Sequence, residues 1–156
     1  MFILSYFQEE LDAFVSDRNT NTPYWKVRKA VVLLAFFGGM RKTEAEALKL
    51  EDIVSSSAGV HVTHSRAKQR SDQLCSKFLV PRCIVGVNYA QILEDYLFAI
   101  KEVLGIKTGR VFYTGNNTKF VRNLMGHNFL GSIPKEMAER LGLDNPKNYT
   151  FHSYRR

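Results

Sequence analysis

The chain has 156 residues, which is the length of one domain with a core of ordinary size. Hydrophobic residues make up 45% and charged residues 24%, a composition that excludes a disordered or collagen-like chain. Lys and Arg total 22 against 15 Asp and Glu, and the formal charge of +7 favours a polyanionic partner. The excess of basic residues lies in 60–87 and 106–156.

Cysteine content and hydropathy indicate the compartment. Cys75 and Cys83 are too few for a disulfide framework, and neither belongs to a Cys-x-x-Cys pair. The apolar start is too short for a signal peptide, and no later apolar run is long enough to span a bilayer. We therefore expect an intracellular protein in a reducing compartment, neither secreted nor membrane-spanning.

The first fifty residues predict three helices. Apolar residues recur at helical spacing over 7–15. A second helix is predicted over 23–37, apolar on most sides of its second half and ended by Gly38-Gly39, so it should be the buried centre of the fold. Thr43 followed by Glu46 is a capping-box pattern that predicts a short third helix.

A hairpin and a long helix are predicted next. Residues 60–66 and 77–81 have β character and are joined by a polar, basic stretch, which predicts an antiparallel hairpin with a third strand near 52–54. Residues 89–104 follow the i, i+3, i+4, i+7 rule and predict a helix whose apolar stripe belongs to the core. Gly105 is placed to cap it.

The last fifty residues predict three more helical segments. After an extended segment and a polar loop over 110–118, one helix should stop near Gly126. The next should begin at 132–134 and close at Gly142. Thr150 can cap a final helix of barely one turn, an ending that suggests truncation. The expected fold is mainly α with a small antiparallel β-sheet (α+β), in a single domain.

Three basic or imidazole side chains have the chemistry of a phosphate site. His152 and Arg155 are three apart at a helix start, so they share a face beside backbone N–H groups that favour an anion. Arg41 lies at the Gly-rich corner after the central helix. Two guanidinium groups can hold both non-bridging oxygens of a phosphodiester and oppose charge growing there. For Arg41 the non-functional alternative is a solvated Arg just beyond a helix C-terminus. For His152 and Arg155 it is an ordinary helix N-terminus.

Several motifs occur in a fixed order around these residues. They are Gly39-Met-Arg-Lys-Thr-Glu44 followed by 48–53, the hairpin around Lys68, and the segments 132–138, 141–146 and 149–156. In this order they resemble the catalytic domain of the tyrosine recombinases, the phage-integrase family, and most closely its eukaryotic Crypton-type branch. The resemblance spans almost the whole chain and implies that family's fold.

The resemblance also implies a mechanism and roles. In that family a Tyr attacks the scissile phosphate and forms a 3′-phosphotyrosyl link, with no metal or other cofactor. Arg41 and Arg155 would clamp the phosphate, His152 would hydrogen-bond it or move a proton, and Lys68, or alternatively Lys77, would be the acid for the leaving oxygen. Four further cations would contact the duplex: Arg66, Arg70, Lys77 and Lys42. Glu44 would brace Arg41.

The chain departs from the family in two places. The family places its nucleophilic Tyr some tens of residues beyond the His-x-x-Arg box, where this chain has nothing, and Tyr149 and Tyr154 lie too close to the box to replace it. The family's separate N-terminal helical domain is also missing. We therefore expect a truncated, inactive fragment that binds double-stranded DNA weakly, is a monomer and resides in the nucleus.

Other interpretations remain open. The chain can be a domesticated, non-catalytic DNA-binding or chromatin-associated module, or an unrelated basic helical interaction domain with accidental matches. His61 and His64 lie three apart on a strand and point to opposite faces, so zinc is not expected. Leu124-Met-Gly-His127 imitates a later box of the family in the wrong order, and a helix end with a local His cap is preferred.

Overall fold

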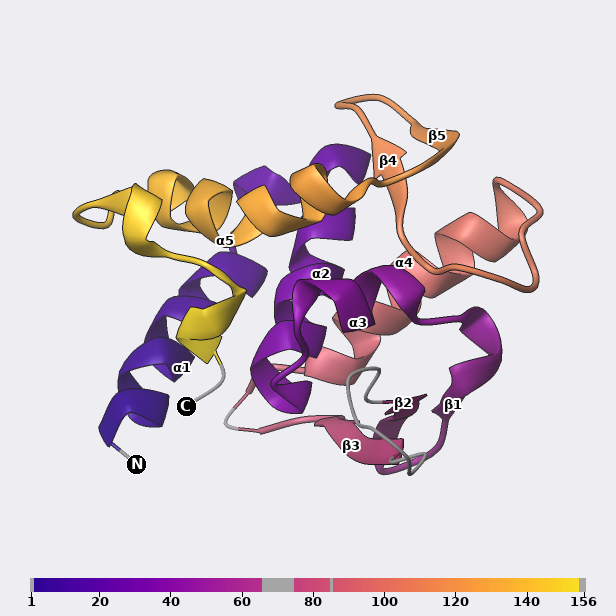
Figure 1. Ribbon diagram of the computed structural model, residues 1–156, viewed down its shortest axis with the longest axis horizontal. Helices are drawn as coiled ribbons and strands as arrows, with labels where there is room; N and C mark the ends of the chain where they lie inside the picture. The colour runs from indigo at the N-terminus through magenta and orange to yellow at the C-terminus, as the bar shows by residue number, and fades with distance from the viewer. Residues whose placement is uncertain (1, 66–74, 85, 155–156) are drawn as a thin grey trace.

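The computed structural model describes residues 2–65, 75–84 and 86–154 (Figure 1). Within these residues the fold is mixed α+β, with five α-helices, a three-stranded antiparallel sheet and a separate two-stranded ribbon. The predicted fold class is confirmed at this level. No helix in the described ranges has the length and apolar character needed to cross a bilayer.

Helix α2 is the centre of the molecule. It covers Pro23–Gly38, and its residues 30–35 are buried at 1% exposure or less, because the sequence is apolar on nearly every side there. Gly39 ends it with φ 57°, a left-handed conformation that favours glycine. Helix α2 contacts each of the other described α-helices (Figure 1). These are α1 (Phe2–Val15), α3 (Lys42–Ala47), α4 (Tyr89–Glu102) and α5 (His127–Arg140).

The three-stranded sheet has the order β1-β2-β3 and is antiparallel throughout. Strand β1 is Ile53–Ser55, β2 is Gly59–Ser65 and β3 is Cys75–Pro81. The β2–β3 register runs from Gly59 opposite Pro81 to Ser65 opposite Cys75. Strands β2 and β3 contact α4, and the side chains of Val60, Val62 and Val80 are fully buried. The predicted hairpin and third strand are confirmed.

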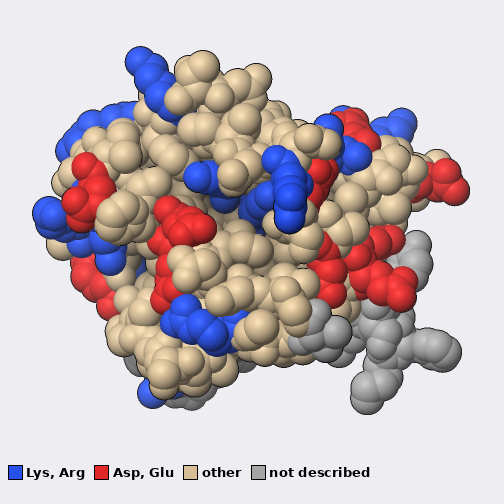
Figure 2. Space-filling model, turned by 180° about the vertical axis from the view of Figure 1, so that it is seen from behind, with Lys and Arg blue, Asp and Glu red and all other residues tan. Residues whose placement is uncertain are grey.

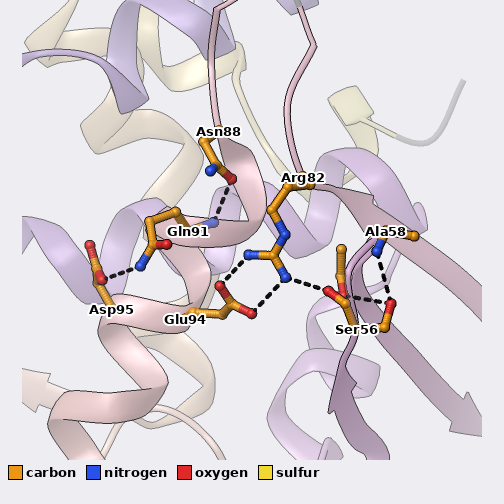
Figure 3. Close-up of polar contacts among 8 residues, drawn as sticks. Ser56, Ala58, Arg82, Asn88, Gln91, Glu94 and Asp95 are labelled. Atoms are coloured by element: carbon orange, nitrogen blue, oxygen red, sulfur yellow. Dashed lines mark hydrogen bonds and ion pairs between the residues drawn. The ribbon is translucent and has the colours of Figure 1, made fainter.

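Arg82 ties this sheet to helix α4 (Figure 3). It follows β3, and its two terminal nitrogens donate to the two carboxylate oxygens of Glu94 on α4, at 2.5 and 3.0 Å. Nη2 also donates to the backbone carbonyl of Ser56 in the turn between β1 and β2. The N-terminus of α4 is capped by Asn88, whose side chain accepts from the Gln91 N–H at 3.0 Å. One guanidinium therefore joins three segments.

This contact predicts a pH dependence of stability. The Arg82 guanidinium, and then the Ser55 hydroxyl, hold the pKa of Glu94 below its ordinary value of 4.5. A carboxyl with a lowered pKa in the folded state stabilises the fold above its unfolded pKa, and that contribution is lost as pH falls through the folded pKa. We expect the difference in unfolding free energy between the natural chain and Arg82→Met to shrink from pH 7 to pH 3 in urea titrations. Lys101→Met is the control, and an unchanged Arg82→Met difference would contradict the prediction.

The segment after the polar loop is a strand, where the sequence predicted a helix. Strand β4 (Tyr113–Gly115) pairs antiparallel with β5 (Phe120–Leu124), with Tyr113 opposite Leu124. The loop between them is closed by Asn116, whose side chain accepts from the Lys119 N–H at 2.8 Å. This Asx turn reverses the chain at once, so the following residues pair with the preceding ones and do not begin a helix.

Helix α5 begins earlier than predicted. It starts at His127 with Gly126 as its N-cap, so Gly126 opens a helix and does not end one. Pro134 lies inside the helix and not at its first turn. The Ser132 hydroxyl donates to the Phe129 carbonyl at 2.9 Å, one turn back, and Leu130, Ile133 and Met137 are buried on one face. Burial of this face offsets the hydrogen bond that Pro134 cannot donate.

Candidate functional site

A pocket of about 440 Å³ lies where α3, α5 and the C-terminal turn meet. The turn is a 3-10 helix over Phe151–Tyr154, where the sequence predicted the start of an α-helix. The pocket brings together residues 41–43 and 150–152, from opposite ends of the chain. Its lining residues are Arg41, Lys42, Thr43, Gly131, Thr150, Phe151 and His152.

Arg41 is held at the sharp corner between α2 and α3. Met40, just before it, is fully buried. The carboxylate of Glu44, which is 4% exposed, accepts the Arg41 backbone N–H at 2.9 Å. The helix start therefore uses Arg41 and Glu44, and the predicted Thr43 and Glu46 pairing is wrong by two residues. The Glu44 carboxylate thus acts as a first-turn cap on the Arg41 main chain, and Arg41 itself lines the pocket.

The Arg41 side chain has no hydrogen bond or ion pair to any part of the chain that the structure describes. Arg41 is partly exposed and is one of the residues that line the pocket. A guanidinium offers five donors, so an anion in the pocket would find them unused. The residue has the position expected for an anion-binding Arg.

His152 reaches the pocket because its neighbour anchors the C-terminal turn. Phe151 is 6% exposed and belongs to the hydrophobic core, and the turn contacts α2. The turn is closed by the Ser153 N–H, which donates to the Thr150 carbonyl at 2.9 Å. The Thr150 N–H donates to the Ser153 hydroxyl at 3.1 Å. His152, the next residue after the anchor, remains exposed.

Lys42 enters the pocket over Gly131 of α5. A Cβ atom placed on Gly131 would lie 3.1 Å from Lys42 Nζ and 3.2 Å from Lys42 Cδ, so the lysine side chain occupies the space that a side chain would take. Sequence reasoning proposed Lys42 as a duplex contact but missed Gly131, Thr43 and Thr150. Residue 131 lay between two predicted helices, so the sequence offered no signal for it.

A polar cluster joins the two helices that line the pocket. Glu46 of α3 lies 3.1 Å from Nδ1 of His127, the first residue of α5. Arg110 donates from Nε to the Glu46 backbone carbonyl at 2.9 Å and lies 3.4 Å from its carboxylate. Arg110 also reaches the Met125 carbonyl at 3.4 Å. His127 thus has a partner at a helix start and is not the cap of a helix end.

The other predicted site residues are distributed as follows. Lys68, Arg155, Arg66 and Arg70 lie outside the described residues. Lys77 is described: it is exposed on β3, opposite Thr63. His61 is exposed and lies 2.8 Å from the Ser56 hydroxyl, whereas His64 is buried against Phe78. In the described ranges no group of three His, Cys, Asp or Glu side chains is arranged to hold a metal ion.

Comparison with known proteins adds no relative. No family model matches the chain, and no curated protein is significantly similar to it. The function of the chain is therefore inferred from the geometry of the site and from the resemblance of its motifs.

The composition of the pocket decides what it can bind. Among the described residues, its lining includes Arg, Lys and His but no Asp or Glu. The nearest buried carboxylate, on Glu44, already accepts a backbone N–H. Oxyanions are the ligands that such donors take, with phosphate and its esters the best match for a guanidinium.

Proposed function

We propose that this chain is a DNA-binding domain with the fold of the tyrosine-recombinase catalytic domain, of Crypton type, and that the pocket holds one phosphodiester of a duplex. The observation that carries the proposal is the joint lining of one pocket by Arg41 and His152. They belong to two separate motifs of the resemblance, and only a fold that closes the chain on itself brings such motifs together. The net charge of +7 agrees with a polyanionic ligand.

The roles follow from the chemistry of the groups. Arg41 would donate to the non-bridging oxygens, His152 would hydrogen-bond the same phosphate or move a proton, and Arg155 would complete the clamp. Lys68, or Lys77, would protonate the leaving oxygen if the strand is broken. In the recombinase reaction a Tyr oxygen bonds to phosphorus while the 5′-oxygen leaves, and no metal is needed. Nuclear residence and a monomeric state belong to the same proposal.

The face opposite the one drawn in Figure 1 is not expected to be the main DNA-binding surface. On the face seen from behind Figure 1, Lys and Arg are interspersed with Asp and Glu, so this face has no continuous basic patch (Figure 2). Sequence-independent duplex binding comes from phosphate contacts. Arg41 would supply one of these contacts, so its loss should lower the affinity for the duplex.

Arg41→Ala is expected to weaken duplex binding about tenfold or more, since a hydrogen bond to a charged group contributes about 1.5–3 kcal/mol. For the natural chain the logarithm of affinity should fall linearly with the logarithm of salt concentration. The slope should be smaller in magnitude by about 0.9 in Arg41→Ala, because one phosphate contact is lost. Fluorescence anisotropy of a labelled duplex, at several salt concentrations, measures both quantities.

Lys101→Ala is the matched control, because Lys101 is an exposed cation on α4 and does not line the pocket. It should change affinity far less than Arg41→Ala. Both variants should keep the unfolding midpoint of the natural chain. Duplex binding that is absent, insensitive to salt, or equal in Arg41→Ala and the natural chain would contradict the proposal.

A further inference from the structure

Gly131 has no backbone reason to be glycine. It lies in the interior of α5, and its φ is not positive. A glycine at such a position costs about 1 kcal/mol of helix stability relative to alanine. The helix also contains Pro134, three residues later, so this segment tolerates two weak helix formers close together.

The space above Gly131 is taken by Lys42. The lysine begins α3, and its Cδ and Nζ both lie within 3.2 Å of the point where a Cβ on Gly131 would stand. Contacts this short force a neighbour to shift. A small side chain would displace the lysine by a few tenths of an ångström, and a large one would take its place. Gly131 and Lys42 line the pocket together.

We propose that Gly131 is a position that sets the affinity of the pocket for an anion. Its missing side chain lets the Lys42 ammonium lie in the pocket as a second cation beside Arg41. This inference rests on the proposed function, in which the ligand is a DNA phosphodiester. A large residue at 131 excludes the ammonium and leaves Arg41 and His152 to hold the anion. Position 131 therefore sets how many positive charges the pocket presents.

The test compares Gly131→Leu, Lys42→Ala and the double variant in the duplex-binding titration described above. Gly131→Leu and Lys42→Ala should each weaken binding about tenfold and reduce the salt slope by about 0.9. The double variant should bind no more weakly than Lys42→Ala, because both changes remove the same contact. Gly131→Ala should keep most of the affinity and have an equal or higher unfolding midpoint.

Two controls separate this effect from damage to α5. Asn128→Leu places the same leucine side chain at an exposed position of the helix that does not line the pocket, and it should leave affinity and slope unchanged. If Gly131→Leu does not fold, Lys42→Ala still decides whether Lys42 is a pocket cation: unchanged affinity and slope overturn the inference. Equal binding by folded Gly131→Leu and the natural chain, or full additivity in the double variant, also overturns it.

Arg41→Ala separates this inference from the proposed function. If Arg41→Ala weakens binding while Lys42→Ala and Gly131→Leu do not, the phosphate pocket stands and the role of position 131 fails. If Arg41→Ala binds as well as the natural chain, the proposed function fails, and the inference fails with it. If the natural chain does not bind a duplex, the proposed function and the inference both fail as well.

Discussion

Glu136→Ala is expected to lower the free energy of unfolding by about 3 kcal/mol or more, which is a large share of the stability of a domain this size. Glu136 on α5 forms an ion pair of 2.7 Å with Arg28 on α2, whose side chain is 6% exposed. The same carboxylate accepts the Tyr24 hydroxyl at 2.7 Å, and its other oxygen lies 3.2 Å from the Ser132 hydroxyl oxygen. Removing it leaves a buried guanidinium without its charge partner.

Urea unfolding at pH 7 measures this loss. Glu139→Ala is the matched control, because Glu139 is on the same helix but pairs with Lys135 in solvent, at 3.6 Å. An exposed i, i+4 pair contributes about 0.3–0.5 kcal/mol, so this variant should be nearly as stable as the natural chain. Glu136→Gln keeps an acceptor oxygen, so its free energy of unfolding should lie between those of Glu136→Ala and Glu139→Ala. Similar losses for Glu136→Ala and Glu139→Ala would show that the buried pair contributes no more than the exposed one.

Tyr96→Phe is expected to cost about 2 kcal/mol or more, although only one oxygen atom is removed. Tyr96 of α4 is fully buried, and its hydroxyl donates to the Val111 carbonyl at 2.8 Å. The same oxygen accepts the Tyr113 backbone N–H at 2.8 Å. The variant would leave two backbone groups without a partner where β4 begins, and each such group costs about 1–3 kcal/mol.

Tyr89→Phe is the control for the loss of a tyrosine hydroxyl from the same helix. Its hydroxyl contacts only side chains, donating to Asp12 and accepting from Gln8, and both can turn to water. The loss for Tyr89→Phe should be clearly smaller in the same urea titrations. If the two variants lose equal stability, the backbone hydrogen bonds of the Tyr96 hydroxyl stabilise the fold no more than the side-chain hydrogen bonds of Tyr89.

The elements that the sequence predicted well are those in which packing and local preference agree. Residues 23–37 are apolar enough to be buried on all sides, and residues 89–104 carry one continuous stripe, so α2 and α4 were predicted almost to their ends. The β2–β3 hairpin was also predicted, since both segments have β character and are joined by a polar, basic stretch. In α4 the spacing of the apolar residues shows directly which face of the helix is buried.

The prediction failed where one residue admits two local structures. Pro134 fits the first turn of a helix by its fixed φ, yet it lies in the middle of α5, where tertiary burial of Leu130 and Ile133 decides. Residues 118–126 contain apolar side chains compatible with helix or strand. The choice was made by pairing with residues 113–115, which no local pattern reveals.

The site could be predicted in part. Arg41 and His152 were identified from motifs, and the structure places both at one pocket. Glu44 was predicted to brace Arg41, and the contact that the structure shows is a helix cap, in which its carboxylate accepts the Arg41 backbone N–H. Gly131 could not be found in this way, because its importance comes from the path of the Lys42 side chain, a relation between two helices about ninety residues apart.

The pocket walls come from residues 41–43, 131 and 150–152, so no fragment shorter than residues 41–152 contains them all. Closing a loop of that length is entropically costly, and contacts between distant segments form late in folding. Helical structure in α2 and α4 can appear before the walls meet. Binding of a nucleic-acid phosphate, as proposed, would therefore require the fully folded chain. A nascent or partly denatured chain would not bind it.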